Sequence, residues 1–288
     1  MRSEQVSVIL PAKNEADSIG PLITEISQLL PDAQVLVVND GSTDATAQIA
    51  MEAGATVLAH PYSKGNGAAI KTGARAAKGD VLVFMDADGQ HAPADIPQML
   101  KAIEKGHDLA VGARSAASQA SVGRLAANKI YNRLASWMVG HKVKDLTSGF
   151  RAVRADKFRE FIALLPNGFS YPTTSTMAFF RAGYSVAYVP IVAGKREGSG
   201  HISIFKDGLK FLLIIFKIGS LYSPLKIFFP TSAVFFTIGL AYYLYTFNTM
   251  GRFTNMSALL FIASIIVFLV GLVSEQITAL LFMQSKDK

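Results

Sequence analysis

Two long apolar segments in the last third of the chain constrain its fold most strongly. From Ile227 onward, charged residues nearly vanish over spans long enough to cross the roughly 30 Å hydrocarbon core of a bilayer. We predict one transmembrane helix over 227–247 and a second over 257–282, interrupted only by Glu275. The polar link between them is too short to form a domain, so the two helices are expected to pair as a hairpin.

Basic residues around this hairpin indicate its orientation. Lysines precede the first helix and follow the second, whereas the link holds a single arginine (206, 210, 217 and 226; 286 and 288; 252). By the positive-inside rule, we expect a multi-pass protein of the cell (inner or plasma) membrane, with both chain ends and the large N-terminal domain in the cytoplasm.

The domain boundaries follow from the same pattern. We assign 1–200 to the cytoplasmic domain, 201–226 to an interfacial amphipathic segment and 283–288 to a cytoplasmic tail. Residues 203–222 are apolar with spaced lysines, which is typical either of a helix in the membrane interface or of a helix packed within the soluble domain. The direct connection to the hairpin favours the interface, where lysines can reach the head groups.

The composition excludes several kinds of site and partner. The chain contains no cysteine, which rules out disulfides and thiolate metal sites. Its net charge of +7 would suit nucleic acid, but no basic run interleaved with aromatic residues occurs. We therefore expect anionic lipid head groups and phosphorylated substrates as partners, and no nucleic acid. The N-terminal segment lacks a long apolar run before a cleavage site, so we expect no signal peptide.

The first half of the chain alternates between strand-like and helix-like segments. Short runs rich in β-branched residues occur at 6–10, 35–39, 56–60, 81–85 and 108–112, separated by segments of helix length. This alternation predicts an α/β fold with a mostly parallel, doubly wound sheet. Ligands of such sheets bind at the carboxyl ends of the strands.

Polar loops follow three of these predicted strands, at 11–15, 40–44 and 86–91, and we expect them to converge on one crevice. Asp86 and Asp88 can direct carboxylate oxygens toward a hard cation that also holds phosphate oxygens, and Gln90 adds a neutral oxygen. An isolated Asp-x-Asp is more often a solvated turn. The setting after a buried strand, beside two further polar loops, favours a metal-diphosphate site.

Other nucleotide-binding motifs are absent or incomplete. No G-x-G-x-x-G follows the first strand, and no G-x-x-x-x-G-K-[ST] occurs, which argues against a dinucleotide dehydrogenase and a P-loop enzyme. The Lys64–Gly67 segment is either a phosphate-binding loop or simply the entry to the helix that follows.

Several motifs together resemble the family-2 glycosyltransferases of the polyprenyl-phosphate type, which include dolichol-phosphate mannose synthases and bacterial undecaprenyl-phosphate sugar transferases. The resemblance extends over almost the whole chain. Its matching segments are Pro-Ala-Lys-Asn-Glu at 11–15, Asn-Asp-Gly-Ser at 39–42, Asp-Ala-Asp-Gly-Gln at 86–90, Gly-Ala-Arg at 112–114, Asp-Leu-Thr-Ser-Gly-Phe-Arg at 145–151, the stretch 196–202 and the hairpin. It implies a GT-A type, Rossmann-like glycosyltransferase domain with interfacial helices and a transmembrane hairpin.

The resemblance also implies roles for individual residues. The nucleotide-sugar pocket would be lined by Pro11, Lys13, Glu15, Val38, Asp40, Asp86, Ala87 and Asp88. Mg²⁺ or Mn²⁺ would be held on the diphosphate by Asp86, Asp88 and Gln90. The acceptor phosphate would be bound by Arg114, Arg124 and Arg196, and the catalytic residues would be Asp88, Arg114 and Arg124. Arg124 is otherwise a surface residue of its helix, and Arg151 is equally a fold-stabilising ion-pair partner or a ligand.

Three positions depart from the family pattern. Asn39 stands where a first aspartate is common, His201 lies near a usual lysine, and the stretch 171–177 lacks an acidic residue. These departures bear on donor and acceptor choice rather than on the reaction class. The Gln-x-x-Arg-Trp signature of processive synthases is absent, which argues against chain elongation.

The expected reaction is transfer of a hexose from a UDP- or GDP-sugar to a polyprenyl phosphate, by metal-dependent displacement with inversion. A phosphate monoester is largely ionised at neutral pH, so the acceptor needs no strong general base. Two alternatives remain at this stage. Transfer to another lipid hydroxyl would require a carboxylate base, for which Asp145 is the candidate, and a non-catalytic membrane scaffold would not need the Asp86–Arg114 set. The sequence allows a homo-oligomer.

Overall fold

The computed structural model describes residues 5–114, 122–168, 170–192, 216, 219–220 and 222–286, with only the backbone described at 122–127 and 282–286. The chain divides into two compact units, 1–204 and 205–288. Each unit is described by itself below.

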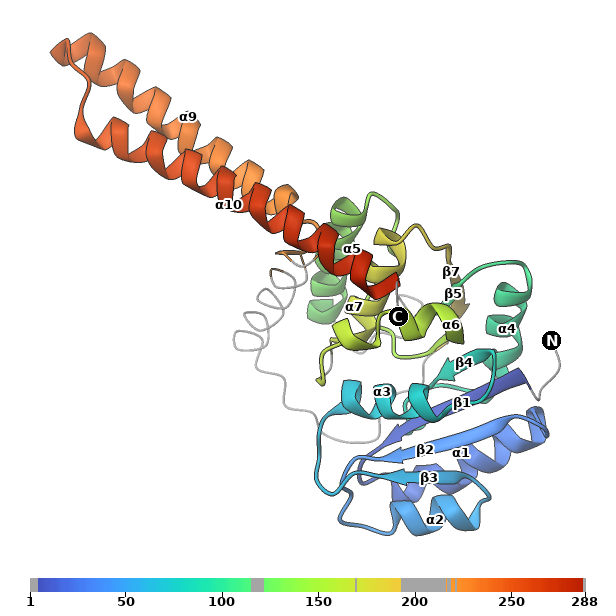
Figure 1. Ribbon diagram of the computed structural model, residues 1–288. Helices are drawn as coiled ribbons and strands as arrows, with labels where there is room; N and C mark the ends of the chain where they lie inside the picture. The colour runs from blue at the N-terminus through green and yellow to red at the C-terminus, as the bar shows by residue number, and fades with distance from the viewer. Residues whose placement is uncertain are drawn as a thin grey trace. The chain divides into compact units, whose positions relative to one another are not determined.

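The N-terminal unit is built on a seven-stranded sheet in the order β3-β2-β1-β4-β6-β5-β7 (Figure 1). The strands are β1 Val6–Ala12, β2 Gln34–Asn39, β3 Thr56–Ala59, β4 Val81–Phe84, β5 Leu109–Arg114, β6 Arg151–Arg154 and β7 Val186–Ile191. β1 pairs in parallel with β2 and β4, β2 with β3, and β5 with β7, whereas β6 runs antiparallel to β4 and β5. The predicted mostly parallel α/β sheet is therefore confirmed.

Helices cover both faces of this sheet (Figure 1). They are α1 Ala16–Leu29, α2 Thr46–Glu52, α3 Asn66–Ala76, α4 Ile96–Glu104, α5 Val122–Val139, α6 Ala155–Glu160 and α7 Tyr171–Arg181, with short 3₁₀ turns η2 Pro93–Asp95 and η4 Ile162–Leu164.

Side chains alternate between the two faces along each central strand, as the pleat requires. On β1, Val6, Val8 and Leu10 enter a core with apolar residues of α1 and α4. Ile9 points to the opposite face, where α3 approaches so closely that a Cβ on Gly73 would lie 2.4 Å from its Cγ2. Each apolar side chain buried in these layers contributes roughly 1.5–3 kcal/mol relative to its exposed state. The sheet is thus a rigid support for the loops at its edges.

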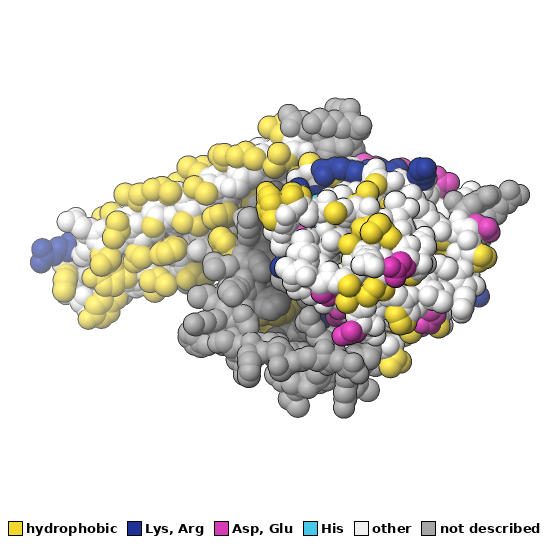
Figure 2. Space-filling model, turned by 90° about the horizontal axis from the view of Figure 1, so that it is seen from below, with side chains coloured by type: hydrophobic (Ala, Val, Ile, Leu, Met, Phe, Trp, Pro, Cys, Tyr) yellow, Lys and Arg dark blue, Asp and Glu magenta, His cyan; other side chains and the backbone are white. Residues whose placement is uncertain are grey.

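The C-terminal unit is a hairpin of two helices, α9 Pro224–Met250 and α10 Asn255–Lys286. Both contain a stretch of 27 residues that is long and apolar enough to cross a membrane by length and composition. α9 ends at Gly251, whose left-handed φ of 64° is suited to glycine and turns the chain back. Figure 2 shows hydrophobic side chains spread over the visible face of the hairpin.

Polar contacts hold the two hairpin helices together. Ser232 and Ser264 each donate a hydroxyl hydrogen bond to the other's backbone carbonyl, at 2.9 and 3.0 Å. Glu275 accepts a hydrogen bond of 3.4 Å from the backbone N–H of Leu225, in the first turn of α9, where helix N–H groups lack partners of their own. Glu275 therefore caps the neighbouring helix.

Candidate functional site

The polar loops predicted to converge do lie at one edge of the sheet. β2 and β4 flank β1, and all three run in the same direction. The loops that leave their carboxyl ends are consequently neighbours. The first two are joined directly, because the N–H of Asn14 donates to Ser42 Oγ at 3.0 Å and the N–H of Glu15 donates to Thr46 Oγ1 at 2.9 Å.

The remaining side chains of the first loop differ in exposure. Lys13 is exposed, Pro11 and Glu15 are half-buried, and Val38 on the adjacent strand is fully buried. Asn14 adopts a left-handed φ of 56°, and its side-chain oxygen accepts from the N–H of Thr43 at 2.8 Å. These contacts fix the backbone of the loop that carries the exposed Lys13.

Asp40, which follows β2, is buried and surrounded by donors from the loop after β3. His60 Nδ1 lies 2.7 Å from Oδ1, Ser63 Oγ donates to Oδ2 at 2.8 Å, and the N–H groups of Lys64 and Gly65 donate at 2.8 and 2.9 Å. Burial alone would raise the pKa of this carboxyl, but these hydrogen bonds outweigh it and hold the pKa at about 2. Asp40 therefore organises the 60–65 loop as a permanent anion.

This finding changes the interpretation of the Lys64–Gly67 segment. Besides the two amides bound by Asp40, the N–H of Gly67 donates to the carbonyl of Gly168 at 3.2 Å. These amides are engaged within the protein, so they do not form a phosphate cradle. The segment instead begins α3 and carries Asn66 toward the next acidic loop.

Asp86, which follows β4, has a different environment. Asp86 is half-buried, and its carboxylate packs closely against Gly149, where an added Cβ would lie 2.5 Å from Oδ2. Its hydrogen bond from Asn66 Nδ2 is long, at 3.5 Å. Burial raises the pKa of Asp86, and the neighbouring charge of Asp88 raises it further. Burial therefore disfavours the ionised form of Asp86, and the single long hydrogen bond from Asn66 offsets this only weakly.

The rest of this loop is held in place around Asp86. The hydroxyl of Ser18 donates to the carbonyl of the buried Ala87 at 2.6 Å, and Asp88 Oδ1 accepts from the N–H of Gln90 at 3.2 Å. His91 is buried against Phe150, with ring centroids 5.3 Å apart. The carboxylates therefore sit on a fixed turn.

The residues present fit a divalent cation bound together with a diphosphate. Two buried polar atoms, Asn66 Oδ1 and His91 Nδ1, have no hydrogen-bond partner among the described residues, and both belong to residues that act electrostatically on Asp86. No cluster of three or more His, Asp or Glu side chains that could hold a metal by themselves occurs in the described part of the chain. Two carboxylates plus ligand phosphates is the arrangement that Mg²⁺ commonly uses.

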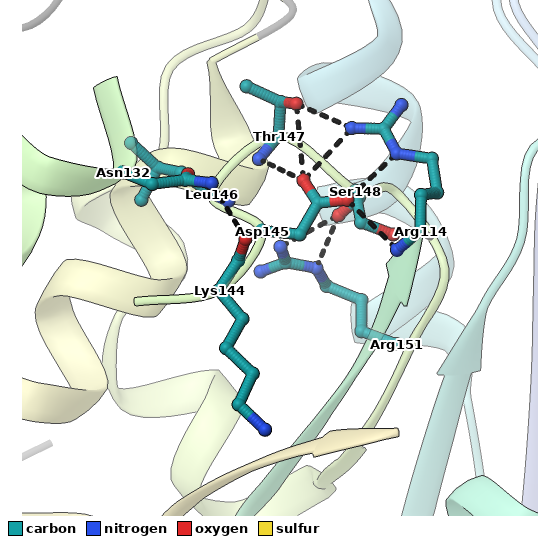
Figure 3. Close-up of polar contacts among 8 residues, drawn as sticks. All are labelled: Arg114, Asn132, Lys144, Asp145, Leu146, Thr147, Ser148 and Arg151. Carbon is teal, nitrogen blue, oxygen red and sulfur yellow. Dashed lines mark hydrogen bonds and ion pairs between the residues drawn. The ribbon is translucent and has the colours of Figure 1, made fainter. Parts of the chain in front are cut away.

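Arg114, at the end of β5, forms a two-pronged ion pair with Asp145 (Figure 3). Its Nε and Nη2 lie 2.8 and 2.9 Å from the two carboxylate oxygens, and Nη2 also donates to Thr147 Oγ1 at 2.6 Å. Burial alone would raise the pKa of Asp145, but Arg114 lowers it below its usual value. β4 and β5 both run antiparallel to β6, so Arg114 at the end of β5 lies at the same end of the sheet as the loop that follows β4.

Arg151 is fully buried and supports the same segment. Its Nε and Nη2 donate to the carbonyl of Ser148 at 3.1 and 2.7 Å (Figure 3). Its Nη1 donates to Ser175 Oγ and Thr176 Oγ1 at 2.7 and 3.2 Å and to the carbonyl of Pro172 at 2.9 Å. Of the two expected roles for Arg151, the structure favours the fold-stabilising one, but all the acceptors are neutral oxygens rather than a carboxylate of an ion pair.

Helix α7 completes this support. Its hydroxyl-rich sequence at 171–177, which lacks the acidic residue common in the family pattern, supplies the oxygens around Arg151. The hydroxyl of Tyr171 donates to the carbonyl of Gly149 at 3.0 Å. Together, Arg151 and Tyr171 hold the 148–149 peptide against Asp86.

Two of the residues predicted to bind the acceptor phosphate, Arg124 and Arg196, have side chains outside the described residues. The backbone of Arg124 lies in the first turn of α5, but its side chain is outside the described residues. Arg196 and His201 also lie outside them. Their roles stay predictions.

Sequence reasoning missed His60, Asn66 and Gly149. No motif marks His60, since it contacts Asp40 across the β3 strand, 20 residues away. Gly149 was noticed only as part of the Asp-Leu-Thr-Ser-Gly-Phe-Arg motif, and its closeness to Asp86 depends on β6 pairing next to β4. The position of Gly149 directly after the polar turn at 145–148 was the one available signal.

Comparison with known proteins identifies related sequences over both units. The profile of glycosyl transferase family 2 matches residues 7–162, and that of the GtrB C-terminal hairpin matches residues 223–280. Polyprenol monophosphomannose synthase of Mycolicibacterium smegmatis is 30% identical over 68% of this chain and 79% of its own length. Undecaprenyl-phosphate mannosyltransferase of Micrococcus luteus is 32% identical over 67% of this chain and 85% of its own.

Solved structures share the fold of the N-terminal unit. Glucosyl-3-phosphoglycerate synthase of Mycobacterium tuberculosis, crystallised with Mn²⁺, UDP-glucose and phosphoglyceric acid, superposes with a TM-score of 0.62 at 23% identity. The match covers 75% of this chain and 79% of that one.

Proposed function

Because the chain belongs to glycosyl transferase family 2, we propose that it transfers a sugar from a nucleotide-diphosphate sugar to a polyprenyl phosphate, giving a lipid-phosphate monosaccharide. The observation that carries the proposal is that the acidic loop at 86–88 and Arg114, whose guanidinium is anchored by Asp145, follow β4 and β5 at the same end of the sheet. Relatives named for polyprenol, undecaprenyl and dolichol phosphate support this acceptor class.

On the donor side, Asp86, Asp88 and Gln90 would hold Mg²⁺ or Mn²⁺ against the diphosphate. When bound, the cation would neutralise the charge that develops on the departing nucleotide diphosphate. Asn66 Oδ1, which has no hydrogen-bond partner among the described residues, and the raised pKa of Asp86 support a positive group at this place. Pro11, Lys13, Glu15 and the exposed rim of the 40–44 loop would contact the nucleotide.

On the acceptor side, the chemistry needs orientation more than proton transfer. A phosphate monoester loses its second proton near pH 6, so its oxygen is a nucleophile at neutral pH. That oxygen would attack the anomeric carbon in line, the bond to the diphosphate would break with its electron pair leaving on the nucleotide, and the configuration would invert. Arg114, Arg124 and Arg196 would hold the acceptor phosphate and offset the repulsion between two anions.

The alternative acceptor, a lipid hydroxyl, is disfavoured by Asp145. That transfer would require a carboxylate free to take the hydroxyl proton. Both oxygens of Asp145 are engaged by Arg114, and its pKa is lowered, so it is a weak base held in an ion pair. The non-catalytic scaffold loses support as well, since the family and its polyprenyl-phosphate relatives are glycosyltransferases.

The hairpin accounts for where the proposed reaction would take place. α9 and α10 would anchor the enzyme in the membrane where the acceptor resides, with the catalytic unit and both chain ends in the cytoplasm. A polyprenyl chain cannot leave the bilayer, so its phosphate must be met at the surface. A homo-oligomer is compatible with this arrangement.

The direct test is transfer of label from a panel of UDP- and GDP-sugars into an organic-extractable, mild-acid-labile lipid. The purified full-length protein is incubated with undecaprenyl phosphate and either Mg²⁺ or Mn²⁺. We expect product from one donor and its loss on chelation. Absence of product from every donor, with nucleotide binding intact, would overturn the proposal and favour another acceptor.

A further inference from the structure

We propose that Tyr62 is the platform on which the base of the donor nucleotide stacks. Tyr62 lies in the loop that follows β3, and its side chain is 67% exposed. The inference rests on the proposed function, in which the donor is a nucleotide-diphosphate sugar. It assigns to that donor a contact with a residue that no motif singled out.

The backbone on both sides of Tyr62 is held by one buried carboxylate. Before Tyr62 in the chain, His60 Nδ1 lies 2.7 Å from Oδ1 of Asp40. After Tyr62, Ser63 Oγ and the N–H of Lys64 each donate to the same carboxylate at 2.8 Å. Asp40 therefore fixes the chain around an aromatic side chain that points into solvent.

The same loop is packed against the loop that follows β2. Gly41 has a left-handed φ of 69°, and a Cβ there would lie 2.7 Å from the backbone nitrogen of Ser63 and 2.8 Å from the carbonyl carbon of Tyr62. Pro61 precedes Tyr62, and its ring limits the φ angle of the chain at that point. An exposed side chain on so rigid a backbone loses little freedom when a ligand binds, which favours tight binding.

The position of Tyr62 along the sheet edge fits the base end of a nucleotide. β3, β2, β1 and β4 are neighbours in that order and all run in parallel, so the loops that follow them share one edge. Three strand spacings of about 4.8 Å, or roughly 14 Å, separate the ends of β3 and β4. With the diphosphate at the 86–88 loop, the nucleoside would extend across the 40–44 loop and bring its base to Tyr62.

The chemistry of the side chain suits a base. Every nucleobase has a flat π-face, so an aromatic ring binds it by stacking whichever base it is. Lys64 Nζ lies over the ring of Tyr62, 5.7 Å from its centroid. This contact orients the ring from one face, and the opposite face would receive the base. An exposed cation–π contact adds little to stability, so the fold itself gains little from a tyrosine here.

A comparison of ligands with and without a base tests the proposal. The affinities of the full-length protein for UDP, GDP and inorganic pyrophosphate, each with Mn²⁺, are measured by isothermal titration calorimetry. Pyrophosphate can occupy the cation and diphosphate site but has no base. We expect Tyr62→Ala to weaken the nucleotide that the wild type binds more tightly by roughly five- to a hundred-fold, with pyrophosphate affinity unchanged.

Two variants serve as controls. Tyr62→Phe keeps the aromatic ring and should keep the wild-type affinity for the nucleotide. Met51→Ala removes a side chain of α2 that is 57% exposed, and it should change the affinity for neither nucleotide nor pyrophosphate. Tyr62→Ala should also melt at the wild-type temperature without ligand, because the side chain is largely exposed.

Two results would overturn the stacking role while leaving the proposed sugar transfer intact. One is an unchanged nucleotide affinity in Tyr62→Ala. The other is an equal loss of affinity for pyrophosphate, which would show that Tyr62 acts through the structure of the loop rather than on the base. A wild-type protein that binds neither UDP nor GDP would instead refute the proposed function, and this inference with it.

Discussion

Asp40 and Asp86 follow the two strands that flank β1, yet the protein treats these carboxylates in opposite ways. Asp40 accepts hydrogen bonds from two side chains and two backbone amides, which hold its pKa at about 2. Asp86 has a long contact from Asn66 and a raised pKa. An acidic residue completed by the protein organises structure, whereas one left incomplete is prepared for a ligand.

The largest effect that would sharpen this contrast is expected when the carboxylates of the acidic loop, Asp86 and Asp88, are neutralised. Asp86→Asn and Asp88→Asn should each reduce sugar transfer by about a thousandfold, since a bound cation supplies several kcal/mol of charge stabilisation. Both proteins should remain folded, and Asp86→Asn should melt no lower than the wild type without ligand, because a half-buried charge with one long hydrogen bond is removed. Turnover and thermal melting measure the two outcomes. Full activity in either variant would refute the metal assignment.

The second effect concerns the packing around Asp86. Gly149→Ala would place a Cβ 2.5 Å from the Asp86 carboxylate oxygen. Relieving such an overlap costs about 1–3 kcal/mol, so we expect Mn²⁺ affinity to fall roughly ten- to a hundred-fold. Electron paramagnetic resonance titration of Mn²⁺ with UDP or GDP measures this affinity. Gly168→Ala is the matched control, because a Cβ there meets no atom within 4 Å. Unchanged affinity in Gly149→Ala would show that Asp86 is not a ligand.

The third effect concerns Asp40, whose carboxylate accepts several hydrogen bonds from the protein. Asp40→Asn should lower the free energy of unfolding by about 2 kcal/mol at pH 7, the equivalent of moving a pKa from 3.8 to about 2. Because the folded pKa lies below the unfolded one, this contribution is present above pH 4 and is lost as the pH falls toward 2. The difference in melting temperature between variant and wild type should shrink over that range. The exposed Asp80→Asn serves as the reference, and an unchanged melting temperature in Asp40→Asn would contradict the assignment.

The sequence predicted that the loops carrying Asp40 and Asp86 lie near one another. It did not predict which of the two carboxylates is satisfied by hydrogen bonds from the protein. Apolar runs identified β1 to β5, and parallel order then required the loops at 11–15, 40–44 and 86–91 to meet. The remaining contacts of the site depend on how strands that are distant in the sequence pair in the sheet. β6 is short and begins and ends with arginine, so no apolar run marked it, and only its insertion beside β4 brings Gly149 to Asp86.

The same reason explains why the sequence left the role of Arg151 open and why it gave no signal for His60. In the sequence, Arg151 suggests a carboxylate partner. Its actual partners include hydroxyl and carbonyl oxygens of α7, more than 20 residues later in the chain, so the local sequence does not reveal them. His60 reads as an ordinary residue at the end of a strand. Long-range partners of buried polar groups are set by tertiary packing, which local pattern does not contain.

The smallest effect is expected at Asn66. It distinguishes a role of Asn66 in ligand binding from a role in packing of the core. Asn66 Oδ1 is buried without a hydrogen-bond partner among the described residues, which costs roughly 1–3 kcal/mol if nothing binds there. Asn66→Ala should therefore leave the melting temperature of the ligand-free protein unchanged or raise it. The increase in melting temperature on adding Mn²⁺ with UDP or GDP should become smaller, because a contact to the bound group is lost. A core role predicts the reverse, with a lower ligand-free melting temperature and an undiminished increase on ligand addition. Asn167→Ala, in the neighbouring loop that accepts from Lys71, is the comparison that should lower stability without changing the response to ligand.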